Sequence, residues 1–195
     1  VIDDKEPVGL CGSGIVDTIG EMIKAGLIDQ TGGIVSEKSA LSSSVADSLR
    51  ERLVDKNGER AFCLIMDDEP VFISQKDIRQ VQLAKGAMRA GIEVLLAEYG
   101  VSPREVDRVY LAGAFGNYLR KENLLRIRLL PEIDADKIVS VGNAAGQGAK
   151  LALINRDKMD EARRISEEVN YIELSFRSDF PDKFISAMSF TEAVD

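Results

Sequence analysis

The sequence contains no histidine, and this absence excludes several kinds of functional site. Ser-His-Asp and Cys-His catalysis, histidine-ligated zinc and a histidine pH switch all need an imidazole. Only two cysteines occur, Cys11 and Cys63, and two thiolates cannot hold a usual iron–sulfur cluster. Chemistry in this chain must therefore use carboxylates, lysine or a bound cofactor.

Long apolar runs and an excess of positive charge are also missing. No uninterrupted hydrophobic run is long enough to span a bilayer. The formal net charge of −8 argues against nucleic acid or an anionic membrane surface as a partner. The scarcity of cysteine favours a reducing, cytoplasmic setting. The chain opens on Val1 rather than on Met, and we expect it to be a domain of a longer protein.

Three glycine-rich turns stand out among the 195 residues. Val109 to Ala112 reads as a short buried strand, which Gly113 and Gly116 then interrupt. A similar strand ends at Val141 before a second glycine-rich segment, and Gly9 to Gly14 is a third. Because glycine lets the backbone approach a ligand closely, these turns predict a site built from backbone rather than from reactive side chains.

The pattern along the chain predicts mixed α and β structure. Ser13 lies at or near the N-cap of a first helix that ends at Gly26, and residues 36–50 read as a loop with one weak helix. The other expected elements are a hairpin of strands 61–66 and 71–74, a long helix from the capping box of Ser74 and Asp77 to Gly100, a single turn at 102–105, strands from 108 and at 137–141, helices at 144–154 and 157–169, a half-exposed strand at 171–175, and a last helix from Pro181.

The long helix carries an apolar and a polar face. The polar face holds Gln82, Lys85 and Arg89. It allows two interpretations, a solvated surface or one wall of a nucleotide site with Lys85 and Arg89 near ribose or phosphate. The predicted apolar stripe consists of Ile78, Val81, Ala84, Met88, Ile92, Leu95 and Leu96.

The glycine turns also allow two interpretations each. Gly12, Ser13 and Gly14 open a helix, so they form either an anion site or a tight turn that permits close packing. The turn at 113–117 either passes beneath a base or phosphate or is a β-turn at a strand end. Both cysteines are expected to be small buried hydrophobes, although Cys11 lies in a glycine turn and could be reactive.

A set of motifs resembles one family over nearly the whole chain. The family is that of the reductive activators of corrinoid proteins. The motifs that carry the resemblance are Gly9-Leu10-Cys11-Gly12-Ser13-Gly14-Ile15-Val16-Asp17, Gln75-Lys76-Asp77-Ile78-Arg79, Leu83-Ala84-Lys85-Gly86-Ala87, Leu111-Ala112-Gly113-Ala114-Phe115-Gly116-Asn117-Tyr118, Val141-Gly142-Asn143-Ala144, Tyr171-Ile172-Glu173-Leu174-Ser175 and Met188-Ser189-Phe190.

The resemblance implies an α/β fold. It is the C-terminal portion of an ATPase domain of the acetate and sugar kinase/heat-shock/actin (ASKHA) superfamily, ribonuclease H-like, with a mixed sheet flanked by helices. Residues 1–195 would be a single domain fragment with a variable hairpin and loop region at 35–75. The family's N-terminal [2Fe–2S] domain and the first lobe, with its phosphate loops, are absent from this sequence.

The resemblance also implies a function, which is ATP-driven reduction of cob(II)alamin to cob(I)alamin in a corrinoid protein partner. ATP with Mg²⁺ is the expected cofactor in the full-length protein, and a homodimer is left open. No catalytic residue is expected here, and the fragment alone should be inactive. The alternatives are a docking module for a corrinoid protein with a vestigial nucleotide site and, ranked last, a small-molecule kinase. The expected nucleotide-binding residues are Gly113, Ala114, Phe115, Gly116 and Asn117 of the adenosine motif, Gln82, Lys85 and Arg89 beside adenine and ribose, and Gly12, Ser13 and Gly14.

One segment departs from the family pattern. Arg120 to Leu130 is strongly basic, whereas family members have smaller residues and a glycine before Leu-Leu-Pro. The local turn, and any contact made there, is therefore not transferred from the resemblance.

Overall fold

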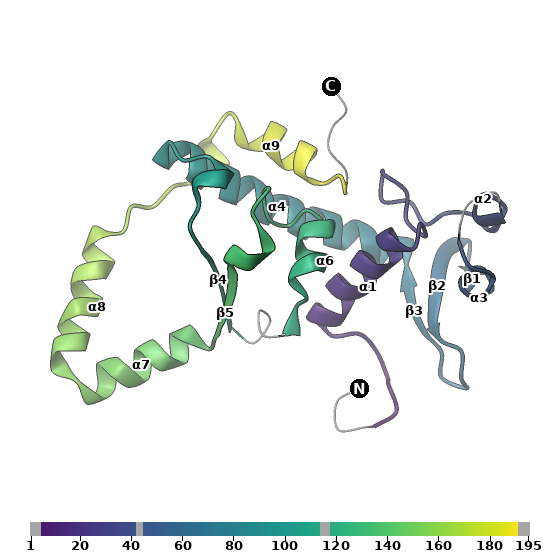
Figure 1. The fold of residues 1–195 in the computed structure, drawn as a ribbon, viewed down its shortest axis with the longest axis horizontal. Helices are drawn as coiled ribbons and strands as arrows, with labels where there is room; N and C mark the ends of the chain where they lie inside the picture. Colours follow the sequence, from purple (N-terminus) through teal and green to yellow (C-terminus); the bar gives the residue numbers. More distant parts are fainter. Residues whose placement is uncertain (1–4, 42–44, 114–117, 191–195) are drawn as a thin grey trace.

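The strands of this mixed α/β protein form two separate sheets (Figure 1). The computed structural model describes residues 5–41, 45–113 and 118–190. The first sheet is antiparallel in the order β1–β2–β3, and the second is a parallel pair, β4–β5. The strands are β1 (Leu53–Lys56), β2 (Glu59–Ile65), β3 (Val71–Ser74), β4 (Val109–Ala112) and β5 (Ile138–Gly142).

Helices pack around both sheets. Helix α1 packs against α6, and the long α4 packs against α9. None of the helices in the described part of the chain is long and apolar enough to cross a membrane. The helices are α1 (Gly12–Lys24), α2 (Glu37–Leu41), α3 (Asp47–Arg50), α4 (Gln75–Tyr99), α6 (Lys121–Arg126), α7 (Ala144–Ile154), α8 (Arg156–Glu168) and α9 (Phe180–Ala187), with 3-10 turns η2 (Pro103–Glu105), η3 (Ala135–Lys137) and η4 (Leu174–Phe176).

The antiparallel sheet follows from its turns. Asn57 (φ 59°) and Gly58 (φ 81°) adopt left-handed conformations between β1 and β2, as a two-residue hairpin turn requires. The Gly58 amide also donates to Asp55 Oδ1 at 2.7 Å. The expected hairpin of β2 and β3 is confirmed, whereas β1 was not expected from the sequence.

The capping box predicted for the long helix is confirmed. Ser74 Oγ accepts from the Asp77 amide at 3.2 Å, and Asp77 Oδ2 accepts from the Ser74 amide at 2.8 Å. These bonds satisfy two of the donors that a helix N-terminus leaves unpaired. At the other end Gly100 caps α4 with φ 66°.

The buried face of α4 matches the predicted apolar stripe only in part, because Ile78 is fully buried and Val81 and Ile92 pack against the core. Met88 and Leu95 of that stripe are 52% and 50% exposed, and Ala84 is exposed as well. Close packing of α9 explains the difference, because a Cβ on Gly86 would lie 3.0 Å from Met188 Cγ. A backbone that approaches this closely selects small residues rather than large apolar ones. The buried residues are Ile78, Gln82, Lys85, Gly86, Ala90 and Val94.

One hydrophobic core joins α1, the antiparallel sheet and α6 to the parallel pair. Ile138, at the start of β5, is fully buried in this core, and Val109 and Leu111 of β4 pack against it. The side chains at the centre of the core are Ile19, Leu27, Ile34, Phe62, Ile73, Ile78, Leu124 and Ile127. The core therefore fixes β4 and β5 relative to α1 and α6.

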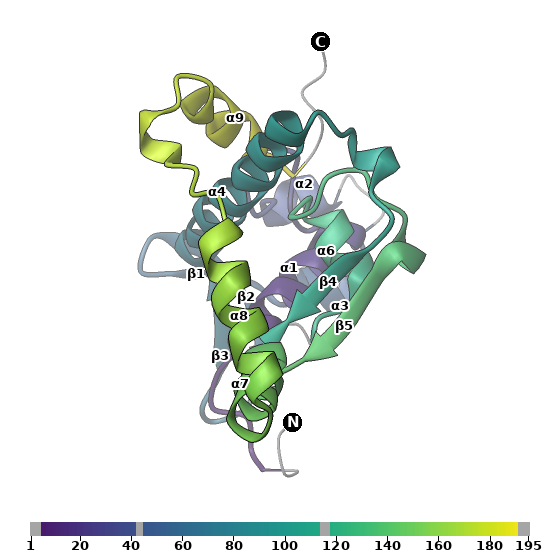
Figure 2. The same cartoon turned by 90° about the vertical axis from the view of Figure 1, so that its left-hand side faces the viewer.

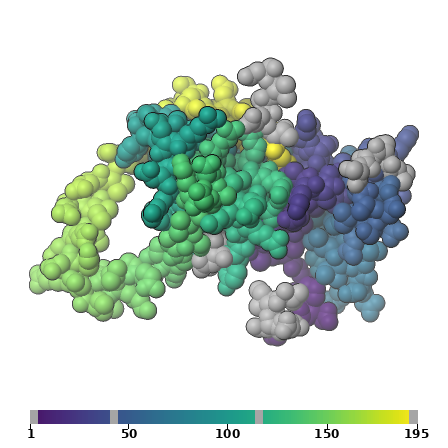
Figure 3. Space-filling model, in the orientation of Figure 1, coloured from purple at the N-terminus to yellow at the C-terminus, as the bar shows by residue number. Residues whose placement is uncertain are grey.

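Helices α7 and α8 form an arm that projects from this core (Figures 1 and 3). Figure 2 shows the same arm crossing in front of the sheets. Its apolar residues are strongly exposed, with Leu153 at 84% and Ile154 at 79%. The two helices contact each other, and neither has a buried residue.

Three sequence predictions about individual helices and strands differ from the structure. The N-cap of α1 is Cys11, two residues before Ser13, which was expected at or near this position. In the described parts of the segment 36–50, α2 and α3 are two short helices where one was expected. Residues 171–175 do not form a strand, because the Glu173 carboxylate accepts from Ser175 Oγ at 2.6 Å and from the Ser175 amide at 3.2 Å. These local bonds close the η4 turn instead.

Candidate functional site

The carboxyl ends of β4 and β5 form one edge, because the two strands are parallel. Ala112 pairs with Gly142 after a register shift at the last step of the ladder. Gly113 then has φ 88° and Gly142 has φ 65°. Both strands thus end in a left-handed backbone that only glycine adopts without strain.

Open space surrounds Gly113. A Cβ built on this residue would meet no heavy atom within 4 Å, so the glycine is needed for its backbone conformation and not for packing. The four residues that follow in the predicted adenosine motif, Ala114, Phe115, Gly116 and Asn117, lie outside the described residues. Their role stays a prediction.

The turn after β5 is fixed by an asparagine. Asn143 is the N-cap of α7, and its Oδ1 accepts from the Gly146 amide at 2.9 Å. A Cβ on Gly146 would lie 2.6 Å from the Asn143 side chain. This glycine therefore permits the cap, which is a structural role.

Helix α1 begins with the predicted residues Gly12, Ser13 and Gly14. Cys11 precedes them and is exposed, so the expectation that it is buried is wrong, while Cys63 is buried as expected. The Cys11 thiol lies 3.3 Å from Ser13 Oγ. This hydrogen bond and the Gly14 amide lower the pKa of Cys11 below its usual value.

The start of α1 lies beside the segment that follows β4. Asp17, in the second turn of α1, accepts from the Arg120 amide at 3.3 Å and from Asn123 Nδ2 at 3.0 Å. Arg120 directly precedes α6. Figures 1 and 2 place the start of α1 and the carboxyl end of β4 toward the same lower side of the molecule. The structure therefore brings two of the glycine segments to one side.

Gln82, on the polar face of α4, is tied to backbone. It is 5% exposed, and its Nε2 donates to the carbonyls of Met188 at 3.0 Å and Thr31 at 3.2 Å. A Cβ on Gly32 would lie 2.5 Å from this amide group. The Gln82 side chain thus joins the loop after α1 to the C-terminal segment.

Lys85 and Arg89 of the same face are also engaged. Lys85 is 1% exposed, donates to the Ser189 carbonyl and lies 5.1 Å from the centre of the Phe190 ring. Burial, together with the positive charges of Arg128 and Arg89, lowers the pKa of Lys85 to about 7. Arg89 pairs with Glu93 and donates to the Leu130 carbonyl.

The polar face is therefore buried, and its interpretation as a solvated surface is wrong. Arg89 lines a cavity with Arg104 and Lys137, which precede β4 and β5. Gly113 follows β4 at the opposite end of the strand. The structure thus does not bring Arg89 to the glycine edge, and the predicted contact of Gln82, Lys85 and Arg89 with adenosine stays a prediction.

The basic segment that departs from the family pattern contains α6. After this helix Arg128 has φ 58°, a conformation that favours glycine. Arg128 directly precedes Leu129-Leu130-Pro131, where the resemblance places a glycine. The turn before Leu-Leu-Pro therefore has the conformation that a glycine favours, although this chain has Arg128 at that position.

No cluster of three or more acidic, cysteine or histidine side chains suited to a metal ion occurs among residues 5–41, 45–113 and 118–190. Residues 1–194 match a family model described as the C-terminal domain of RACo, the ASKHA domain. The chain belongs to this family. The resemblance to reductive activators found in the sequence is thereby confirmed, as is the ASKHA fold class.

Individual relatives of this RACo-type domain agree with the family match. The chain is 35% identical over 200 residues to the corrinoid activation enzyme RamQ of Eubacterium limosum, covering 100% of this chain and 33% of RamQ. It is 24% identical over 164 residues to the [Co(II) methylated amine-specific corrinoid protein] reductase of Methanosarcina barkeri, covering 84% of this chain and 25% of the reductase.

A solved structure also resembles this RACo-type domain. The chain superposes on a reductive activator for corrinoid,iron-sulfur protein with a TM-score of 0.81 and 34% identity. The match covers 94% of this chain and 28% of that chain. The domain thus spans at most about a third of the length of these relatives.

Proposed function

We propose that this domain is part of a reductive activator that uses ATP to drive the reduction of Co(II) to Co(I) in a corrinoid protein. The family match over residues 1–194 carries the proposal. The relatives support it through their names, which describe a corrinoid activation enzyme and a Co(II) corrinoid protein reductase. Residues 1–195 would act as a single domain, with the region 35–75 as its variable part.

Within this proposal, the glycine edge forms the adenosine side of the nucleotide cleft. Gly113 and the segment 114–117 would pass beneath the nucleoside, and Gly12 to Gly14 would offer backbone amides. The supporting observations are the left-handed Gly113 in open space and the start of α1 on the same side of the molecule. Amides at a helix start are unpaired and lie at the positive end of the helix dipole, so they suit anionic groups.

The chemistry would be shared with other parts of the protein. We propose that Mg²⁺ accompanies ATP and that a [2Fe–2S] cluster outside this chain supplies the electron. Within the described residues, the proposed role of this chain is to bind and orient the nucleoside through its backbone. We assign no catalytic side chain to it.

A comparison of two glycine variants tests the position of the nucleotide. Gly113 (φ 88°) and Gly58 (φ 81°) both have left-handed backbones and open space around the position of a Cβ. Alanine should therefore cost each about 1 kcal/mol of stability, but only Gly113 lies at the glycine edge. Calorimetry of Mg-ATP binding to the full-length protein should show at least tenfold weaker binding for Gly113→Ala and unchanged binding for Gly58→Ala. Equal affinity of both variants would refute the assignment of Gly113.

A second candidate function is docking of the corrinoid protein without a working nucleotide site. The exposed apolar side chains of the α7–α8 arm favour it, because large apolar residues gathered on one surface often mark a protein contact. Under this hypothesis Leu153→Asp would abolish capture of the corrinoid protein by the full-length activator. ATP binding at micromolar affinity, combined with unchanged capture by Leu153→Asp, would exclude this candidate.

A further inference from the structure

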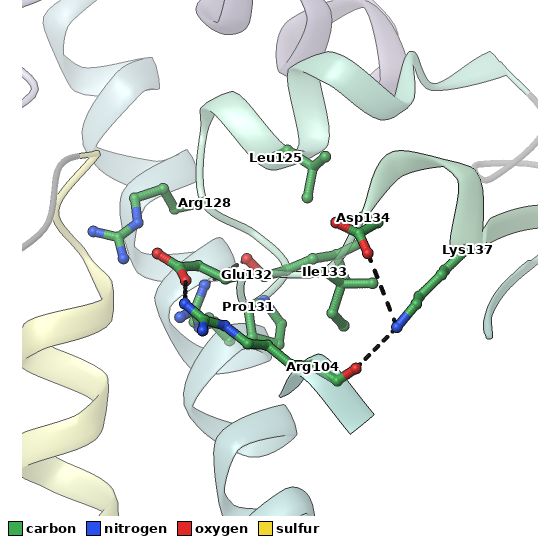
Figure 4. Close-up of a pocket in the computed structure, with 10 residues that line it drawn as sticks. Arg104, Leu125, Arg128, Pro131, Glu132, Ile133, Asp134 and Lys137 are labelled. Carbon is green, nitrogen blue, oxygen red and sulfur yellow. Dashed lines mark hydrogen bonds and ion pairs between the residues drawn. The ribbon is translucent and has the colours of Figure 1, made fainter. Parts of the chain in front are cut away.

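The cavity that Arg89, Arg104 and Lys137 line lies at the amino ends of β4 and β5, away from the glycine edge. It has a volume of about 520 Å³, which is within the usual range for a small-molecule site. Arg104 lies on η2 before β4, and Lys137 lies at the end of η3 before β5. Figure 4 shows these residues around the cavity with Arg128. Gly12, Ser13, Gly14 and Gly113 of the proposed nucleotide site do not line this cavity, whereas Arg89, which the resemblance places beside adenine and ribose, does.

The cavity is positively charged, although the chain as a whole has a formal net charge of −8. Four cationic and two anionic side chains line it, which leaves a formal charge of +2. The cationic residues are Arg89, Arg104, Arg128 and Lys137, and the anionic ones are Glu132 and Asp134. The pKa of the nearby Lys85 is lowered first by its burial and then by the positive charges of Arg128 and Arg89.

The carboxylates of Glu132 and Asp134 already neutralise part of the positive charge in the cavity. Glu132 pairs with Arg104 at 3.7 Å, and both side chains are mostly exposed, at 64% and 86%. In the view of Figure 4, the Glu132 carboxylate has Arg104 and Arg128 on either side. An exposed ion pair at this distance contributes little stability. Glu132 can therefore leave when a stronger anion enters.

The remaining lining is apolar. Leu130, Pro131 and Ile133 are buried beside the charged groups, so the cavity combines a hydrophobic wall with guanidinium groups. Arginine side chains suit the planar, two-oxygen geometry of phosphates and carboxylates. An apolar wall adds contact area for the carbon part of a ligand.

We infer that this cavity binds a small organic anion carrying phosphate or carboxylate groups, with Arg104, Arg128 and Lys137 as its ligands and Glu132 as the group it displaces. The site is separate from the proposed nucleotide cleft, since it lies at the amino ends of the strands. The Lys137 side chain is positioned at the cavity by two contacts. Its Nζ donates to the Arg104 carbonyl at 2.9 Å and lies 4.0 Å from Asp134.

Calorimetry with inorganic pyrophosphate and, separately, citrate tests this inference on the full-length protein without Mg²⁺. Arg128→Gly should weaken binding about tenfold, which is the effect of losing one charge-assisted contact. The variant should fold, because φ 58° at this position suits glycine. Glu132→Gln should strengthen binding several-fold, since it removes the competing carboxylate. The preferred probe identifies phosphate or carboxylate as the recognised group.

Two controls separate this cavity from general charge effects and from the nucleotide cleft. Arg108 is exposed and lies outside the cavity lining, so Arg108→Ala should leave both affinities unchanged. Gly113→Ala should also leave them unchanged, whatever its effect on ATP. The inference is overturned if neither probe binds at about 1 mM. It is also overturned if Arg108→Ala weakens binding as much as Arg128→Gly, or if Glu132→Gln does not strengthen it.

Discussion

The contact between α1 and α6 depends on a glycine that leaves room for a buried asparagine. A Cβ on Gly20 would lie 2.6 Å from Asn123 Cγ and Oδ1 and 2.7 Å from its Cβ. Asn123 is fully buried and cannot retreat into solvent. It donates to Asp17 Oδ1 at 3.0 Å and accepts from Arg126. The substitution Gly20→Ala must therefore move the asparagine or separate the two helices.

The expected cost can be worked from these contacts. Overpacking of a filled interior costs about 1–3 kcal/mol. Distortion of the hydrogen bonds of a buried amide costs about 1–3 kcal/mol more. Alanine recovers about 1 kcal/mol because it favours the helical backbone. We therefore expect Gly20→Ala to lower the free energy of unfolding by about 3 kcal/mol.

Urea unfolding followed by far-UV circular dichroism measures this change. Gly148→Ala is the matched control, because Gly148 is also helical but a Cβ there would meet nothing within 4 Å. This control should gain about 0.5–1 kcal/mol from helix propensity alone. In an Asn123→Ala background, Gly20→Ala should cost little, because the obstructing side chain is gone. Equal stability of Gly20→Ala and Gly148→Ala would show that Asn123 does not obstruct a side chain at position 20.

Three further predictions concern α4 and the turn after α6. The pKa of Lys85 is about 7 in the folded protein against 10.5 for an ordinary lysine. Between pH 7 and pH 10.5 the unfolded chain therefore binds more protons than the folded one, so the free energy of unfolding should rise with pH. Lys85→Met should reduce that slope by up to about 1.4 kcal/mol per pH unit, as measured by urea unfolding at pH 7 to 10. Arg128→Gly should raise the free energy of unfolding by about 1 kcal/mol in high salt, because φ 58° strains arginine; a fall in thermal midpoint would contradict this. Ser74→Ala should cost about 1 kcal/mol through loss of the capping box, whereas Ser102→Ala should cost less because it caps only a 3-10 turn.

Much of the fold could be predicted because its signals are local. The capping box at Ser74 and Asp77, the turn at Asn57 and Gly58, and the paired capping residues Ser102 and Glu105 each depend on a few neighbouring residues. Strands β2 to β5 and helices α7 to α9 were expected close to their observed bounds. Burial and backbone preference act in the same direction in these segments.

What could not be predicted depends on contacts between distant segments. Hydrophobicity alone suggested that Met88 faces the core and that Lys85 either faces solvent or contacts a nucleotide. Packing of α9 and the C-terminal segment instead leaves Met88 exposed and buries Lys85, which excludes the solvated surface. The contact of Gly20 with Asn123 likewise joins two helices that lie about a hundred residues apart. At the candidate site, Gly113 and the start of α1 were identified from their glycines. That they lie toward the same side of the molecule is seen only in the structure.

The carbonyl that Lys85 contacts lies 104 residues further along the chain, at Ser189, and Gln82 contacts one 106 residues away, at Met188. During synthesis at about 5–20 residues per second, the ammonium group of Lys85 must wait roughly 5–20 s for its acceptor. Until then α4 presents an unsatisfied lysine and amide beside Gly86 and Ala90. The last residues of the described chain thus decide when α4 can bury this face, which makes completion of the C-terminal segment a late step in folding.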